Sequence, residues 1–211
     1  WIIDSGLKFT LTIGSVSNEK YTVKDTANQK FIFNSSGQLV KIVDNNEQTI
    51  LIQYTNNRIT TISDGADRNF TLTYGNDGNL NKIVSPYGTK TFAYTNNNLT
   101  SITDVDNEQI KYTYNSHNLL TKVENIDGYN VNYTYTDSEP YRIASIEERA
   151  GSTPGQSIDI TYGINWNTFT NSNGRKEEYS FNSAGHTNSI VTMDGYAESY
   201  KYITEGEHKN R

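Results

Sequence analysis

A short aromatic motif recurs along this chain at an almost constant interval. Each copy has an aromatic or aliphatic residue, then any residue, then an aromatic residue that we term the anchor. The steps between successive anchors are 21, 20, 20, 20, 21, 27, 19 and 21 residues. A fixed period predicts a repeat protein, in which each unit buries its apolar side chains against its neighbours. The anchors are Phe33, Tyr54, Tyr74, Tyr94, Tyr114, Tyr135, Tyr162, Phe181 and Tyr202.

Two turns in each repeat predict that the unit is a β-hairpin. Some anchors are followed by a turn that ends in Gly, as at 34–37 and 182–185, where a left-handed residue is required. Others are followed by an Asn pair, at 56–57 and 96–97, and Asn is the non-glycine residue that best tolerates positive φ. A second turn, such as that at 44–47, closes each unit. The repeat is therefore strand, turn, strand, turn, which is an antiparallel meander.

Alternation along the strands predicts two different sheet faces. Residues 70–74 read Phe-Thr-Leu-Thr-Tyr, which places aromatic and aliphatic side chains on one face and Thr on the other. The apolar pair after each first turn, such as Ile59 and Ile62, is three residues apart and breaks the alternation. We expect either a β-bulge there or partial cover on both faces. The predicted fold class is all-β: a repetitive antiparallel hairpin meander of about 20 residues per repeat in a long, twisted and curled sheet.

The periodicity also predicts how the chain is divided. The repeat array is expected to occupy residues 20–204, after an N-terminal strand region or incomplete repeat at 1–19 and before a tail at 205–211. The single long step predicts an insertion within 137–157, whose Pro and Gly residues indicate a protruding loop. Most such insertions only add length, although loops carry function more often than strands do. We expect the chain to be a fragment of a longer protein that holds the targeting signals.

Composition excludes several classes of function. Hydrophobic residues make up only 34% of the chain, and Tyr is abundant, which suits a sheet surface better than a deep core. The net charge is −6 without any run of Lys or Arg, so nucleic acid and membrane surfaces are not expected partners. There is no Cys, which removes disulfides and thiolate chemistry. No apolar run is long enough to span a membrane.

No residue cluster predicts catalysis, a metal or a cofactor. The segment 104–108 partly matches a calcium loop but lacks its Gly and final Glu, so we expect a turn whose Asp binds its own backbone. Glu147 and Glu148 are adjacent and should point to opposite faces, which does not suit a glycosidase acid and base. Three His residues show no ligand spacing: His117, His186 and His208. We therefore predict that the chain is not an enzyme.

The tyrosine anchors are the candidate site, with two possible roles. They form a structural ladder between strands, or their rings are exposed and stack on glycans, and exposure decides between these roles. The candidate residues are Tyr54, Tyr74, Tyr94, Tyr114, Tyr135 and Tyr162.

The repeat resembles the YD repeat of the RHS repeat family. The best matches are LTYGNDGNLNKIVSPYG at 72–88 and YTYNSHNLLTKVENIDG at 112–128, and the resemblance covers about residues 20–202. The family favours Asp after the Tyr and Arg before the Leu; here that Arg is kept only as Arg58. The position of the Asp is occupied instead by Thr55, Gly75, Thr95, Asn115 and Thr136.

This resemblance implies a role as well as a fold. Members are secreted or surface-displayed bacterial proteins whose repeats spiral into a β-walled shell, which in many cases encloses a toxic domain. We therefore predict a non-catalytic structural or interaction module, joined to the remainder of its own longer chain. A glycan-binding module is the alternative, although choline-binding repeats need paired Trp and only Trp1 and Trp166 occur here. An enzyme built on the Glu147 loop is the least favoured reading, and cut sheet edges would allow a homo-oligomer.

Overall fold

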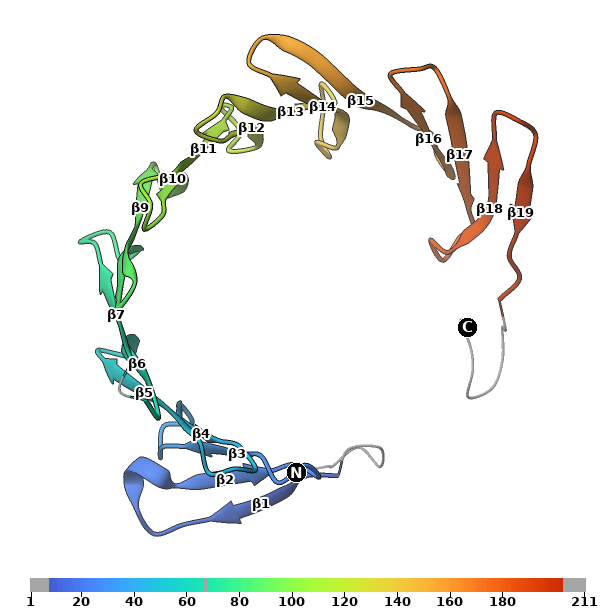
Figure 1. The fold of residues 1–211 in the computed structure, drawn as a ribbon. Coiled ribbons are helices and arrows are strands. Elements are labelled where there is room, and N and C mark those ends of the chain that lie inside the picture. Colours follow the sequence, from blue (N-terminus) through green and yellow to red (C-terminus); the bar gives the residue numbers. More distant parts are fainter. Residues whose placement is uncertain (1–7, 67, 203–211) are drawn as a thin grey trace. The chain divides into compact units, whose positions relative to one another are not determined.

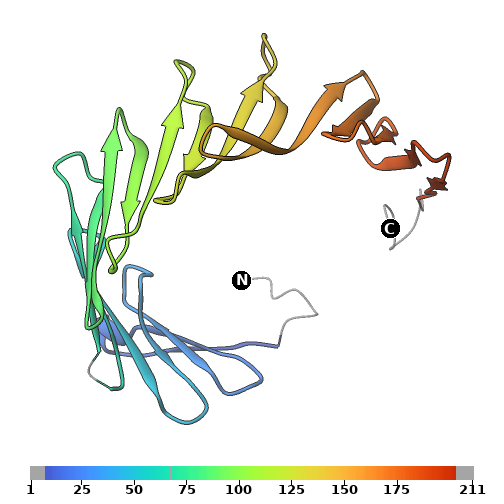
Figure 2. The same ribbon diagram turned by 45° about the horizontal axis from the view of Figure 1, so that its top comes forward.

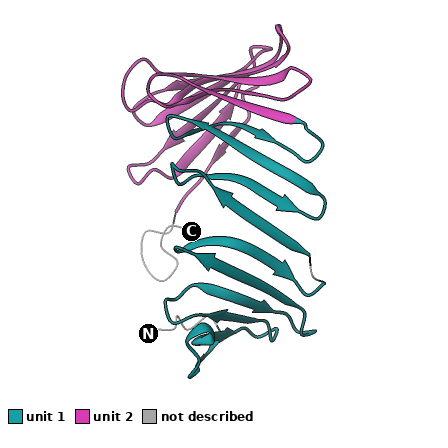
Figure 3. Ribbon diagram, turned by 90° about the vertical axis from the view of Figure 1, so that its left-hand side faces the viewer, with its two compact units in different colours: residues 1–108 teal, residues 109–211 magenta. Residues whose placement is uncertain are grey.

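The computed structural model describes residues 8–66 and 68–202, and their regular secondary structure is almost entirely β-strand (Figures 1 and 2). Their one helical element is a short 3-10 turn, η1 (Ser17–Glu19). The chain divides into two compact units, residues 1–108 and 109–211 (Figure 3). The predicted tail at 205–211 and the first seven residues lie outside the described residues. The predicted all-β fold class is confirmed.

Unit 1 is an antiparallel meander in which each strand pairs with the strand before it. Its strands are β1 (Thr10–Ile13), β2 (Tyr21–Lys24), β3 (Lys30–Phe33), β4 (Leu39–Val43), β5 (Thr49–Thr55), β6 (Arg58–Asp64), β7 (Asn69–Tyr74), β8 (Leu80–Ser85), β9 (Gly88–Thr95) and β10 (Asn98–Thr103).

Unit 2 repeats this arrangement, again with antiparallel pairing between successive strands. Its strands are β11 (Gln109–Tyr114), β12 (Leu120–Glu124), β13 (Tyr129–Tyr135), β14 (Ile143–Ala150), β15 (Thr153–Tyr162), β16 (Trp166–Asn171), β17 (Lys176–Phe181), β18 (Thr187–Thr192) and β19 (Ala197–Ser199).

The first turns have the backbone conformations that their residues predict. Asn56 and Asn57 take φ values of 51° and 62°, and Gly37 takes 78°. The Asn that opens the longer turn also accepts backbone hydrogen bonds, since Asn34 Oδ1 receives the N–H groups of Ser36 and Gln38 at 3.0 Å each. These local bonds close the hairpin without tertiary help.

A β-bulge follows the first turn in the repeats whose apolar pair breaks the alternation. Tyr54 pairs with Ile59 and Gln53 with Thr61, so Thr60 is the extra residue. In two other repeats the extra residue is again Thr and its hydroxyl donates across the ladder, from Thr100 to the Ala93 carbonyl at 3.2 Å and from Thr121 to the Thr113 carbonyl at 3.1 Å. The expected bulge is therefore confirmed, and it explains the three-residue spacing of the apolar pairs.

The apolar core is thin, because each unit is a single sheet. In β7, the exposure alternates so that Phe70, Leu72 and Tyr74 are half-buried while the intervening residues are exposed. The buried aliphatic residues of the described chain are Ile32, Val40 and Val43, and Tyr54 packs against them. Most burial therefore comes from half-covered side chains that lie against their neighbours in adjacent strands.

The long step between anchors produces an extended hairpin. Most of residues 137–157 belong to β14 and β15, and a turn at Asp137–Arg142 precedes them. The tip of this hairpin is attached to the preceding hairpin, because the Gly151 N–H donates to the Gly128 carbonyl at 3.0 Å. Asn130, which is 2% exposed, donates its amide hydrogens to the carbonyls of Gly128 at 2.9 Å and Gly151 at 3.1 Å. The inserted residues therefore extend the sheet.

Candidate functional site: the tyrosine clamps

Anchor tyrosines join successive hairpins through their hydroxyl groups. In each case the hydroxyl donates to a backbone carbonyl at the start of the second strand of the preceding hairpin, and we term this bond a tyrosine clamp. A half-buried phenol needs such an acceptor. The clamps among the described residues are Tyr54 to Leu39 (3.0 Å), Tyr74 to Ile59 (2.9 Å), Tyr135 to Leu120 (2.7 Å), Tyr162 to Ile143 (2.8 Å) and Tyr202 to Thr187 (2.7 Å).

The residue before the acceptor carbonyl often packs on the ring of the same tyrosine. The Arg58 guanidinium lies 5.2 Å from the centroid of Tyr74, and that of Arg142 lies 5.0 Å from Tyr162. A cation over an aromatic face is attracted by the ring quadrupole. The imidazole of His186 takes the same place against Tyr202, with centroids 4.9 Å apart. Ring and hydroxyl are thus both held by one dipeptide of the preceding hairpin.

Four of the six predicted tyrosines form clamps, whereas Tyr94 forms none within the described part of unit 1. Tyr94 is half-buried, but its hydroxyl makes no corresponding bond in the described chain. The second turn of its repeat is short, because Ser85 pairs with Gly88, and so only 14 residues separate Leu80 from Tyr94. Tyr114 anchors the first strand of unit 2 and is also half-buried. Tyr202 was absent from the candidate list, although the period had already marked it as an anchor.

Shallow grooves follow the clamps along the first-turn edge. They have volumes of about 430 Å³ beside Tyr54, 470 Å³ beside Tyr74 and 400 Å³ beside Tyr135. Thr and Asn side chains contribute much of the lining, and the tyrosine hydroxyls are already used as donors. Burial, and to a lesser extent Tyr133, raises the pKa of Tyr135, which keeps this hydroxyl protonated. These groups hold the repeats together and are not poised for acid–base chemistry.

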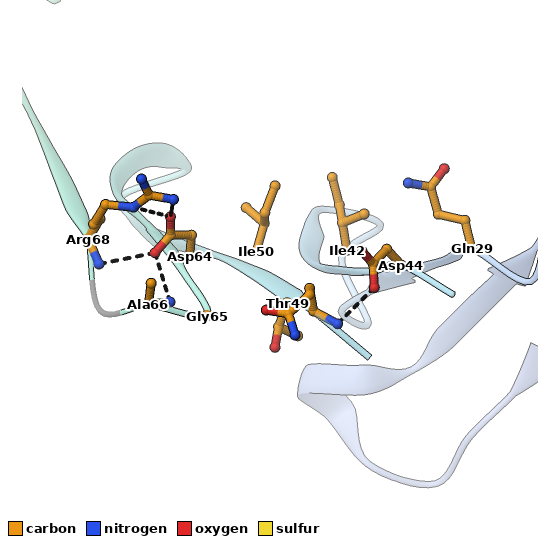
Figure 4. A pocket seen from close by; sticks show the side chains of 10 residues that line it. Gln29, Ile42, Asp44, Thr49, Ile50, Asp64, Gly65, Ala66 and Arg68 are labelled. Carbon is orange, nitrogen blue, oxygen red and sulfur yellow. Dashed lines mark hydrogen bonds and ion pairs between the residues drawn. The ribbon is translucent and has the colours of Figure 1, made fainter. Parts of the chain in front are cut away.

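A further pocket of unit 1, with a volume of about 320 Å³, lies at the second turns and contains two carboxylates (Figure 4). Asp44 and Asp64 each accept backbone N–H groups of their own turn, and Asp64 also pairs with Arg68 at 2.6 Å. The Arg68 side chain, helped by the Ala66 N–H, lowers the pKa of Asp64. Both oxygens of Asp64 are therefore occupied in holding the turn.

The other carboxylates that were considered for metal binding or catalysis are bonded to neighbouring groups of the protein. Asp104 accepts the Val105 N–H at 2.7 Å, which confirms the turn expected at 104–108. Glu147 pairs with Arg149 at 2.8 Å, whereas the neighbouring Glu148 bonds Tyr129 and raises its pKa, so the two carboxylates face opposite ways. The described part of the chain contains no group of three or more acidic, His or Cys side chains placed to hold a metal. Within 8–66 and 68–202, no helix has the length and apolarity needed to cross a bilayer.

The fold and the clamps define a β-hairpin repeat protein, in which each hairpin is tied to the next by an anchor side chain. Residues 94–129 match the family model of the RHS repeat. This match supports, over that part of the chain, the RHS-repeat resemblance that the periodic tyrosines predicted. No curated protein matches the chain in sequence.

Many solved structures are similar to this chain, including the following three. The crystal structure of TcdB2-TccC3-TEV is 11% identical, with a TM-score of 0.51 over 86% of this chain and 13% of that chain. For TcdB2-TccC3-Cdc42 the identity is 10% and the TM-score 0.41, over 87% and 16%. A porin-like protein from Bacteroides uniformis has 10% identity and a TM-score of 0.40, over 96% and 85%. The first likeness supports the fold, and this chain spans a small part of the length of that protein.

Proposed function

We propose that the chain is a non-catalytic wall segment, an RHS-type array within an exported surface protein or polymorphic toxin. The tyrosine clamps are the observation that carries this proposal. In the clamped repeats, the hydroxyl that could serve a ligand or a reaction is instead bonded to the preceding hairpin, as Tyr74 is to Ile59. A side chain used in this way contributes to the nearest-neighbour stability that repeat arrays depend on.

The proposed partner is the remainder of a longer polypeptide. RHS repeats form walls by adding hairpins in series, and this chain is similar to 13% of the length of a much longer protein. The exported location rests on the RHS resemblance. Glycan stacking on the clamp tyrosines is less favoured, because their rings are half-buried and two of them are covered by an Arg side chain.

Deletion of one complete repeat tests the wall proposal. Removing residues 55–74 joins Tyr54 to the turn that normally follows Tyr74, so hairpin order and strand direction are kept. We expect this variant to retain β-sheet circular dichroism and a cooperative denaturant transition at a lower midpoint. The matched control removes residues 55–64, which deletes a single strand and should prevent folding of the array. Equal loss of structure in both variants would contradict an array built from whole hairpins.

The exported location needs a separate test. An antibody raised against the purified chain should detect the protein on intact source cells or in their medium, with a cytoplasmic protein as the control for lysis. Detection only after the cells are broken would overturn this part of the proposal.

A further inference from the structure

One face of the last strands of unit 2, β16 to β19, combines aromatic and acidic side chains (Figure 1). Phe169 lies opposite Glu177 in the pairing of β16 with β17. Two residues further along β17, Tyr179 lies opposite Ile190, which in turn lies opposite Glu198 of β19. Residues two apart in a strand share a face of the sheet. We term this surface the acidic aromatic face; its polar and aromatic members are Phe169, Glu177, Tyr179, Tyr196, Glu198 and Tyr200.

Hydrogen bonds hold each carboxylate of this face among the rings. The Tyr179 hydroxyl donates to Glu177 at 3.2 Å, and the Tyr179 ring meets Phe169 edge to face, with centroids 5.3 Å apart. Tyr196 donates to one oxygen of Glu198 at 2.7 Å, and Tyr200 donates to the other oxygen. The rings of Tyr196 and Tyr200 are 62% and 39% exposed. In the clamps, by contrast, the hydroxyl bonds a backbone carbonyl of the preceding hairpin.

The two carboxylates are charged but have no cationic partner in the described chain. The phenols of Tyr200 and Tyr196 lower the pKa of Glu198, which keeps it ionised at neutral pH. Every ion pair found within 8–66 and 68–202 uses a carboxylate other than Glu177 and Glu198. Lys176 lies opposite Thr170 and so belongs to the other face of the sheet. The face thus presents negative charge beside exposed rings.

We propose that the acidic aromatic face binds an arginine-bearing segment of another protein. A guanidinium stacks on an aromatic ring with its plane and donates in-plane N–H groups to a carboxylate, so one Arg uses both features of this face. The chain already shows the stacking half of this contact, because Arg58 packs on Tyr74 and Arg142 on Tyr162. Complementary charge also favours a basic partner for a chain with a net charge of −6.

The guanidinium has to come from a different polypeptide. Each Arg of the described chain already packs on a ring or pairs with a carboxylate, and a second copy would bring the same occupied groups. These residues are Arg58, Arg68, Arg142, Arg149 and Arg175.

A labelled peptide of alternating Arg and Gly tests this proposal by fluorescence anisotropy with the whole chain. We expect saturable binding, weaker binding of a Lys-Gly peptide of equal length and charge, and no binding of a Gly-Ser peptide. The Lys peptide binds less well because an ammonium cannot stack and form paired hydrogen bonds at once. Equal affinity for the Arg and Lys peptides would overturn the proposal, as would displacement of the Arg peptide by the neutral sugar maltoheptaose.

Two adjacent residues locate the binding on this face. Glu177→Gln and Glu178→Gln change the net charge equally, but Glu178 lies opposite Thr168 and Val191 on the other face. Glu177→Gln should weaken the Arg peptide by about tenfold, as loss of a charge-assisted hydrogen bond does. Glu178→Gln should change the affinity by less than about twofold. Equal effects would show attraction to the net charge alone and would overturn the proposal.

Two further variants make the result independent of folding and of the chain's own basic residues. Glu198→Gln alters an exposed residue of β19, so it should weaken the peptide without affecting folding even if Glu177→Gln folds poorly. Lys209→Gln combined with Arg211→Gln, in the full chain, should leave the affinity unchanged. Unchanged affinity in folded Glu198→Gln would overturn the proposal. Clearly tighter binding without Lys209 and Arg211 would also overturn it, because these residues would then occupy the face themselves.

Discussion

The Tyr162 hydroxyl donates to the Ile143 carbonyl across 19 residues of chain, whereas Tyr135 reaches Leu120 across 15. The bond is nevertheless of ordinary length, at 2.8 Å. The additional residues lengthen β14 and β15 beyond the clamp, and the other inserted residues enlarge the turn before Ile143. The insertion thus leaves the clamp between the two hairpins unchanged. This indicates that extra residues are tolerated where they do not disturb the clamp.

Removing one clamp hydroxyl should destabilise the array. Tyr135→Phe keeps the ring but leaves the Leu120 carbonyl without its donor, and we expect a loss of about 0.5–1.5 kcal/mol. The control is Tyr94→Phe at an equivalent, half-buried anchor that makes no clamp, where the change should be within about 0.5 kcal/mol. Urea unfolding of both variants measures the difference. Equal effects would show that the hydroxyl bond contributes nothing.

Alkaline pH should weaken the same contact. Burial raises the pKa of Tyr135, so the folded chain retains this proton more strongly than the unfolded chain. The resulting stabilisation is complete below the unfolded pKa of about 10 and is lost as the pH rises through the folded pKa. We expect the urea midpoint to decrease once the pH rises beyond about 10. The decrease should be smaller in Tyr135→Phe. Parallel curves for the two proteins would contradict this assignment.

Replacing the buried Asn130 should destabilise the protein more than replacing an exposed Asn. Asn130→Ala removes two donated bonds to the turn carbonyls of Gly128 and Gly151, and the acceptor of the Asn132 amide at 2.8 Å. Unsatisfied buried groups cost about 1–3 kcal/mol each, so we expect a loss of at least that size. Asn76→Ala, at an exposed turn position, is the control and should be nearly neutral. Similar unfolding midpoints for the two variants would exclude a stabilising role for Asn130.

Local chemistry explains why the hairpins could be predicted from sequence. Asn56, Asn57 and Gly37 specify their turns through backbone preference, and alternation specifies the strand faces. The clamps could not be assigned individually, because they depend on the length of the second turn. One fewer residue between Leu80 and Tyr94 leaves that hydroxyl without the clamp.

The environment of Trp166 could not be predicted from sequence for a different reason. Trp166 was considered only as evidence against choline sites, which need paired Trp. Its indole lies on Gly163, where an added Cβ would fall 2.1 Å from the ring, and that contact is visible only in three dimensions.

Gly78 and Gly37 provide a test of how the Arg58 side chain supports its clamp. Both glycines have left-handed φ values, 87° and 78°, so replacement by Ala strains either backbone by about 1 kcal/mol. At Gly37 an added Cβ would have no neighbour within 4 Å. At Gly78 it would lie 2.6 Å from Nη2 of Arg58. The Arg58 guanidinium must then leave the Tyr74 ring.

We therefore expect Gly78→Ala to cost more than Gly37→Ala by about 0.5–1 kcal/mol, the usual size of an exposed cation–π contact. Denaturant unfolding of each variant, alone and combined with Arg58→Ala, measures this excess. The excess should vanish in the Arg58→Ala background, because the contact that Gly78→Ala displaces is already absent there. If the excess persists without the guanidinium, the cost arises from the backbone of the turn, and Arg58 has no part in holding Tyr74.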